Sequence, residues 1–174
     1  MAGNMEFDRE LEFSYGVVEQ LSPLVRRVIA PNPSPFTFHG TGTYIVGKGK
    51  VSIIDPGPNL NDHITALLTA VGDETVTHIL ITHTHRDHSP AASALQEATG
   101  APTYGFGPHG SGRPDAGGDV EEGADHNFEP DCEVRDGARI IGSGWTFTAL
   151  HTPGPVSYTH LRAHETDSYL VCRL

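Results

Sequence analysis

Cysteine, basic residues and long apolar runs are all scarce in this chain of 174 residues. The two cysteines, Cys132 and Cys172, are too few for a disulfide framework. Eleven Lys and Arg stand against 22 Asp and Glu, and the resulting formal charge of −11 repels a phosphate backbone. We therefore expect no DNA partner. RNA could bind only where a local feature of the surface, such as a bound metal ion, attracts its phosphates.

Membrane and export signals are also lacking. No apolar run approaches the roughly 18 residues of a membrane span, and residues 1–13 are acidic rather than basic and then apolar. These absences predict a cytoplasmic protein without a membrane partner, and they leave the oligomeric state open. With 37% hydrophobic residues and 20 glycines, the composition favours one folded domain over disorder.

Short apolar runs alternate with helical periodicity along the chain. Eight runs are expected to form strands, at residues 17–18, 24–30, 43–46, 51–54, 77–82, 102–104, 140–141 and 145–150. Two helices are predicted, over about 61–71 with Asn59 or Asn61 as the cap, and over 90–99. Residues 105–130 are rich in glycine and acid and are expected to form a long surface loop. This order predicts a layered α/β architecture in which helices cover a sheet.

Three imidazoles and one carboxylate fall within positions 83 to 88, directly after an expected strand. Imidazole and carboxylate suit zinc, manganese or iron(II). His83 and His85, two apart in extended backbone, point the same way and can bind one metal, whereas Asp87 and His88 can reach a second. A metal-bound water with a pKa near 7 supplies hydroxide at neutral pH, so the pattern favours a hydrolytic metal site over a solvated turn.

His151 is a candidate third ligand for the metal held by His83 and His85. It ends the strand expected at 145–150 and precedes the tight turn of Thr152-Pro153-Gly154. A histidine in such a place is as often a surface residue as a ligand. The cluster at 83–88 is what favours the ligand interpretation.

These motifs resemble those of the metallo-β-lactamase superfamily. Residues 82–88 (THTHRDH) are similar to its T-H-x-H-x-D-H signature, Asp55-Pro56-Gly57 to its first motif, and residues 151–154 (HTPG) to its H-T-P-G motif. Asn32-Pro33, Phe36-Thr37 and residues 40–44 (GTGTY) look most like the branch of β-lactamase-like protein 2 and glyoxalase II. The resemblance implies an αββα sandwich, of which this chain holds the N-terminal part, with a two-metal site at one edge of the sheets.

The resemblance also implies a ligand set for two zinc ions, with iron or manganese as alternatives. His83, His85 and His151 would bind the first ion, and Asp87 and His88 the second. Asp87 would be the catalytic residue that orients a metal-bound hydroxide. Asp55 would be a structural acid beneath the site, bonded to backbone rather than to metal.

The implied activity is a metal-dependent hydrolase whose hydroxide attacks an ester, thioester, amide or phosphodiester. The substrate is either a small-molecule ester or thioester, or RNA, which leaves an endoribonuclease as one alternative. An iron-dependent oxidoreductase of the same fold is another. A non-catalytic fragment that binds one metal ion is the third.

The pattern departs from the family after Gly154, where neither a bridging aspartate nor a last histidine for the second metal has a credible counterpart. Residues 156–166 (VSYTHLRAHET) and 169–174 back-translate in one frame to strings that resemble sequencing-library adapter and primer. We therefore expect a metallo-β-lactamase-like domain over 1–154, incomplete at its C-terminal side, and a non-native tail over 155–174. The 174-residue chain is then expected to be inactive and to have at most one tight metal site.

Overall fold

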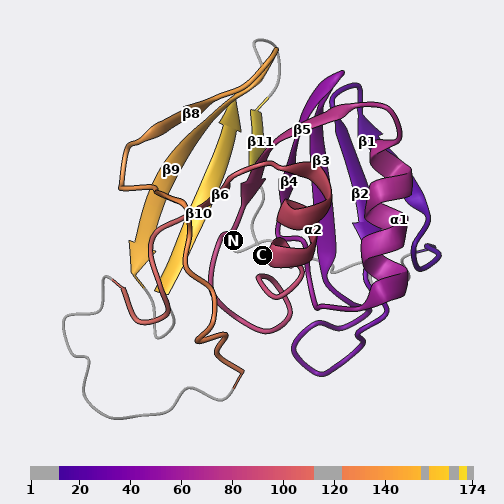
Figure 1. Ribbon diagram of the computed structural model, residues 1–174, viewed down its shortest axis with the longest axis horizontal. Coiled ribbons are helices and arrows are strands. Elements are labelled where there is room, and N and C mark those ends of the chain that lie inside the picture. The colour runs from indigo at the N-terminus through magenta and orange to yellow at the C-terminus, as the bar shows by residue number, and fades with distance from the viewer. Residues whose placement is uncertain (1–11, 112–122, 154–156, 165–168, 172–174) are drawn as a thin grey trace, which may run out of the picture.

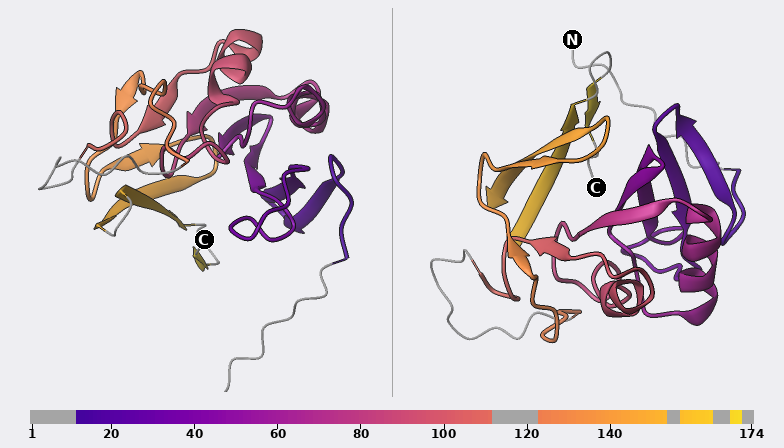
Figure 2. Two further views of the ribbon diagram at one scale, coloured as in Figure 1. Left: turned by 90° about the horizontal axis from the view of Figure 1, so that it is seen from below. Right: turned by 45° about the horizontal axis from the view of Figure 1, so that its top comes forward.

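The computed structural model describes residues 12–111, 123–153, 157–164 and 169–171, the last two ranges as backbone. Two sheets and two helices form its layers (Figure 1). Helices α1 (Asn61–Val71) and α2 (Ala92–Thr99) cover one face of a seven-stranded sheet, and a four-stranded sheet lies against its other face (Figure 2). Neither helix is long or apolar enough to cross a membrane, as judged over the described residues.

The larger sheet follows the order of the chain. Its strands are β1 (Val18–Ser22), β2 (Val25–Ile29), β3 (Gly42–Lys48), β4 (Lys50–Ile54), β5 (Thr75–Leu80), β6 (Thr103–Gly105) and β7 (Cys132–Glu133). The first four pair antiparallel, and from β4 to β7 the pairing is parallel. Because α1 and α2 connect parallel neighbours, the carboxyl ends of β4, β5 and β6 meet at one edge of the sheet.

The smaller sheet is antiparallel and has the order β11-β10-β9-β8. Its strands are β8 (Arg139–Ile141), β9 (Thr146–Pro153), β10 (Ser157–His164) and β11 (Tyr169–Val171). The backbone of β10 pairs with β9 along its whole length. The predicted domain boundary at Gly154 falls outside the described residues, and the non-native origin of residues 155–174 stays a prediction.

Two buried clusters hold the layers together. Val51, Ile53 and Leu67 belong to the cluster between the helices and the larger sheet. Ile54 and Phe147 belong to a second cluster, between the two sheets. The alternation of Ile53 and Ile54 between the clusters follows from the two-residue period of a strand, and it explains why β4 is apolar on both faces.

Helix α1 covers the predicted residues but has a different cap, and helix α2 begins later than predicted. Leu60, in extended backbone, precedes α1 without a side-chain cap hydrogen bond, so the expected asparagine cap is wrong. Helix α2 begins at Ala92 rather than at residue 90, because the turn before it is tied to the Asp55-Pro56-Gly57 turn: the amide of Ala91 donates to the carbonyl of Gly57 at 3.0 Å.

Candidate metal centre

The site is built at the edge of the larger sheet where β4, β5 and β6 end. Asp55 follows β4 and adopts a left-handed backbone with φ of 49°. Its amide donates to the carbonyl of Leu80 at the end of β5 (2.9 Å), and the amide of Gly57 donates to the carbonyl of His88 (2.9 Å). These bonds join the DPG turn to the strand before the histidine-rich loop, residues 82–88, and to the last residue of that loop.

Asp55 fixes the start of this loop through Thr82. The buried carboxylate of Asp55 accepts from the amide of Thr82 at 2.8 Å and from its hydroxyl at 2.7 Å. The Thr82 hydroxyl has only one hydrogen, so its 3.0 Å contact with Nδ1 of His83 requires Nδ1 to be the donor. The lone pair of His83 is therefore on Nε2, the nitrogen that would bind a metal.

Three side chains of the loop converge. His83, His85 and Asp87 each present one ligand atom, and these atoms all lie within 4.8 Å of one another. The ring centroids of His83 and His85 are 4.8 Å apart. Two imidazole nitrogens and a carboxylate oxygen at this spacing suit a zinc-class ion, so the residues present fit a metal.

The electrostatics favour the metal-binding forms of these groups. Burial, assisted by the neighbouring His88, lowers the pKa of His83 to about 4, so its imidazole is neutral at pH 7. Burial alone would raise the pKa of Asp87, but its contacts with His88 outweigh burial and lower it. A neutral imidazole and an ionised carboxylate are the protonation states that a metal requires.

His88 lies between two carboxylates. Its Nδ1 is 3.0 Å from Asp55 and its Nε2 is 3.2 Å from Asp87. Burial disfavours a charge on His88, but the two carboxylates overcome it and raise its pKa to about 10. In this arrangement His88 is an imidazolium, and ligation of a second ion through Nε2 requires it to release both its proton and Asp87.

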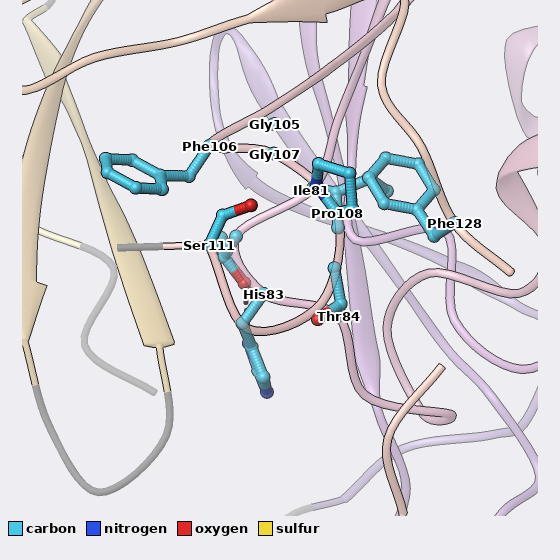
Figure 3. A pocket seen from close by; sticks show the side chains of 10 residues that line it. Ile81, His83, Thr84, Gly105, Phe106, Gly107, Pro108, Ser111 and Phe128 are labelled. Atoms are coloured by element: carbon cyan, nitrogen blue, oxygen red, sulfur yellow. Dashed lines mark hydrogen bonds between the residues drawn. The ribbon is translucent and has the colours of Figure 1, made fainter. Parts of the chain in front are cut away.

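His151 lies near the end of β9 in the smaller sheet, outside the group of three. Its ring stacks on Phe106, with centroids 4.3 Å apart and planes at 13°, and its amide donates to Asp136 at 2.9 Å. Phe106 follows β6 and points away from His83, toward the four-stranded sheet (Figure 3). The guanidinium of Arg135 lies 5.2 Å from the Phe106 ring centre.

A cavity of about 20 Å³ lies beside His83, bounded by Phe106, Ser111 and Phe128 among others (Figure 3). A space of this size holds about one water molecule. It is therefore too small to be a substrate pocket.

Sequence reasoning missed the segment of residues 123–128, which was expected to be part of a surface loop. The structure places it across the histidine-rich loop, where the amide of Asp125 donates to the carbonyl of Thr84 at 2.9 Å. Its carboxylate accepts from the hydroxyl of Ser89 at 2.6 Å. Nothing in the local composition signals this contact, because it joins residues that are 36 positions apart.

Comparison with known proteins supports the same family over most of the chain. Residues 37–172 match the family described as the Metallo-beta-lactamase superfamily. The chain is 41% identical over 145 residues to the Beta-lactamase-like protein 2 homolog of Caenorhabditis elegans, which covers 79% of this chain and 44% of that protein. It is 45% identical over 75 residues to an atrochrysone carboxyl ACP thioesterase of Cryptosporiopsis sp. (strain 8999), covering 41% and 23% respectively. The chain thus spans less than half the length of these relatives.

Solved structures show the same fold. A metallo-beta-lactamase from Cronobacter sakazakii, a mutant in its HARLDQ motif, aligns with a TM-score of 0.65 and 22% identity, over 86% of this chain and 60% of that one. A class B3 di-zinc metallo-beta-lactamase from an Alaskan soil metagenome aligns with a TM-score of 0.64 and 18% identity, over 87% and 58%. The predicted fold class and the predicted resemblance are confirmed.

Proposed function

Because this chain belongs to the metallo-beta-lactamase superfamily, we propose that it carries the metal-binding part of a zinc-dependent hydrolase that acts on a thioester or related small ester. The observation that carries the proposal is the convergence of His83, His85 and Asp87 at the carboxyl edge of a parallel sheet. A cluster of exposed acids would form without a metal, but two imidazoles and a carboxylate converging with one imidazole held neutral by burial suit an ion.

The residues of this site have separate roles in binding metal and in orienting water. His83 and His85 would hold the ion, with Asp87 beside them, and we propose His151 as a further ligand and His88 as a ligand for a second ion. A bound zinc ion supplies a water with a pKa near 7 and polarises a carbonyl oxygen. The ionised Asp87 carboxylate would accept a hydrogen bond from the attacking water and orient it. Asp55 and Thr82 keep the proton of His83 on Nδ1.

A thioester is favoured over RNA as substrate. One relative with 45% identity over 75 residues is an ACP thioesterase. The charge of −11 would repel the phosphates of RNA, whereas a neutral acyl group carries no such penalty. We propose this catalytic activity for a protein of the relatives' full length, because this chain spans less than half of that length.

Zinc titration of the metal-free 174-residue chain tests the proposal. We expect one tight site per chain, measured by competition with a chromophoric chelator and by elemental analysis of the dialysed protein. His39→Ala is the matched control, because His39 lies beside Phe38 in the loop between β2 and β3 and outside the ligand group, and it should leave the affinity unchanged. Failure of the unsubstituted chain to retain zinc would overturn the proposal, and two equally tight sites would overturn the single-site expectation.

A further inference from the structure

A segment remote in sequence is paired with the backbone of the histidine-rich loop. The amide of Asp125 donates to the carbonyl of Thr84, and the amide of Arg86 donates to the carbonyl of Gly123, both at 2.9 Å. The two bonds flank His85, which forms an antiparallel bridge with Ala124. The backbone that carries the second histidine is thus held from outside, like a strand by its neighbour.

A buried side-chain pair reinforces this contact. The Ser89 hydroxyl donates to Oδ2 of Asp125 at 2.6 Å, and the amide of Asn127 donates to Oδ1 at 3.1 Å. Ser89 is 1% exposed and Asp125 is 9% exposed. A carboxylate this buried is stable only with such partners, so the pair is a fixed part of the structure rather than a surface contact.

Ser89 links Asp125 to the loop. The hydroxyl of Ser89 lies 3.2 Å from the carbonyl of His85, and the amides of His88 and Ser89 donate to that same carbonyl at 2.9 and 3.1 Å. The turn that brings Asp87 back toward His85 is therefore closed at the point where Asp125 attaches. Asp55 fixes the opposite end of the loop through Thr82.

We propose that Asp125 is a positioning residue for the metal group, acting through Ser89 and the backbone of His85 rather than by touching the ion. This inference rests on the proposed function, since it assigns the segment of residues 123–128 the task of holding His85 and Asp87 at the spacing a metal needs. A site held by this segment is preorganised, so the ion does not have to order the loop when it binds.

The test measures zinc affinity of the full 174-residue chain by chelator competition. Asp125→Ala removes both acceptors and should weaken zinc binding by about tenfold, the lower end of what loss of an outer-shell partner costs. Asp125→Asn should restore most of the affinity, because its carbonyl can accept from Asn127 and its amide can pair with the Ser89 hydroxyl. Ser89→Ala, which breaks only the side-chain link, should give a smaller loss.

Asp131→Ala is the matched control for a purely structural effect. Asp131 also joins a loop to a strand, accepting from the amide and hydroxyl of Thr103 at 2.8 and 2.7 Å, but it is not among the residues that bond to the histidine-rich loop. This variant should lower the melting temperature of the metal-free chain while leaving zinc affinity unchanged. The visible spectrum of the Co²⁺-loaded chain should change in Asp125→Ala and not in Asp131→Ala.

The outcomes separate the two proposals. Wild-type affinity in Asp125→Ala, or an equal loss in Asp131→Ala, would overturn the inference and leave the proposed function standing. If Asp125→Ala does not fold, Ser89→Ala decides: a loss of affinity supports the inference and an unchanged affinity overturns it. If the unsubstituted chain binds no zinc, both proposals are overturned.

Discussion

The histidine-rich loop and the end of β9 each carry a histidine that was predicted to bind metal, but the molecule holds these histidines in different ways. His83 and His88 of the loop are 9% and 7% exposed and sit among hydrogen bonds to Asp55 and Thr82. His151 at the end of β9 is half-buried, and its ring rests on Phe106. An aromatic stack adds only about 0.5–1.5 kcal/mol beyond the area it buries.

This difference shows that hydrogen bonds to Asp55 and Asp125 set the geometry of the loop, whereas the position of His151 depends on how the two sheets pack. The loop is closed by hydrogen bonds from Thr82 to Asp55 at one end and from Ser89 to Asp125 at the other. The position of β9 depends on the cluster between the sheets, in which Phe147 is almost fully buried. We therefore expect changes in the loop to act on metal binding and changes beneath β9 to act first on stability.

The largest effect should come from Phe147→Ala. Removal of this phenyl ring, which is 1% exposed, leaves a cavity between the sheets and should lower the free energy of unfolding by about 3–5 kcal/mol. Urea denaturation of the metal-free chain measures it. Ile141→Ala, at a site that is 66% exposed, is the control and should change stability by no more than about 0.5 kcal/mol. A loss below about 1 kcal/mol in Phe147→Ala would mean that the sheets do not depend on this cluster.

The loop and β9 can be compared directly through the zinc affinities of His85→Ala and His151→Ala. His85 lies in the group whose ligand atoms converge, so its loss should weaken zinc binding by more than the roughly 10–100-fold expected for an outer-shell partner. As a ligand His151 would have to give up its stack on Phe106, which offsets about 0.5–1.5 kcal/mol of what it contributes, so its loss should weaken binding less than that of His85. Chelator competition measures both, and equal losses would show that β9 contributes as firmly as the loop.

The smallest of the three effects, for each pH unit, is a pH dependence within the loop. The pKa of His88 is raised to about 10, so the folded chain holds this proton more tightly than the unfolded chain does. The stability that the charged His88 contributes is complete below about pH 6.5 and is lost as the pH rises through about 10. The raised pKa already includes the opposing effect of burial, and the loss is spread over this range at about 1 kcal/mol for each pH unit.

A comparison with His88→Gln isolates this contribution, since glutamine keeps a hydrogen-bonding group and does not titrate. The difference in unfolding free energy between the two metal-free chains should shrink as the pH is raised from about 6 to about 10. A difference that is constant over this range would show that His88 is not the titrating group.

Local patterns predicted most of the elements because each pattern has a local cause. The apolar run before His83 is β5, and the runs predicted at residues 43–46 and 51–54 lie in β3 and β4, which pair as a hairpin. Strand β7 has two residues, too few for any periodicity, and its pairing with Tyr104 exists only in the folded sheet. The asparagine cap was wrong because Leu60 takes the position before α1.

The family and the donor group of the loop could be predicted from the chain alone, because His83, His85 and Asp87 are close in sequence and follow one strand end. The fold was needed to show that His88 lies between Asp55 and Asp87, that His151 stacks on Phe106, and that Asp125 accepts from Ser89. Those contacts join residues on separate strands and loops. Their distances are fixed by how the layers pack, and spacing along the chain carries no record of that packing.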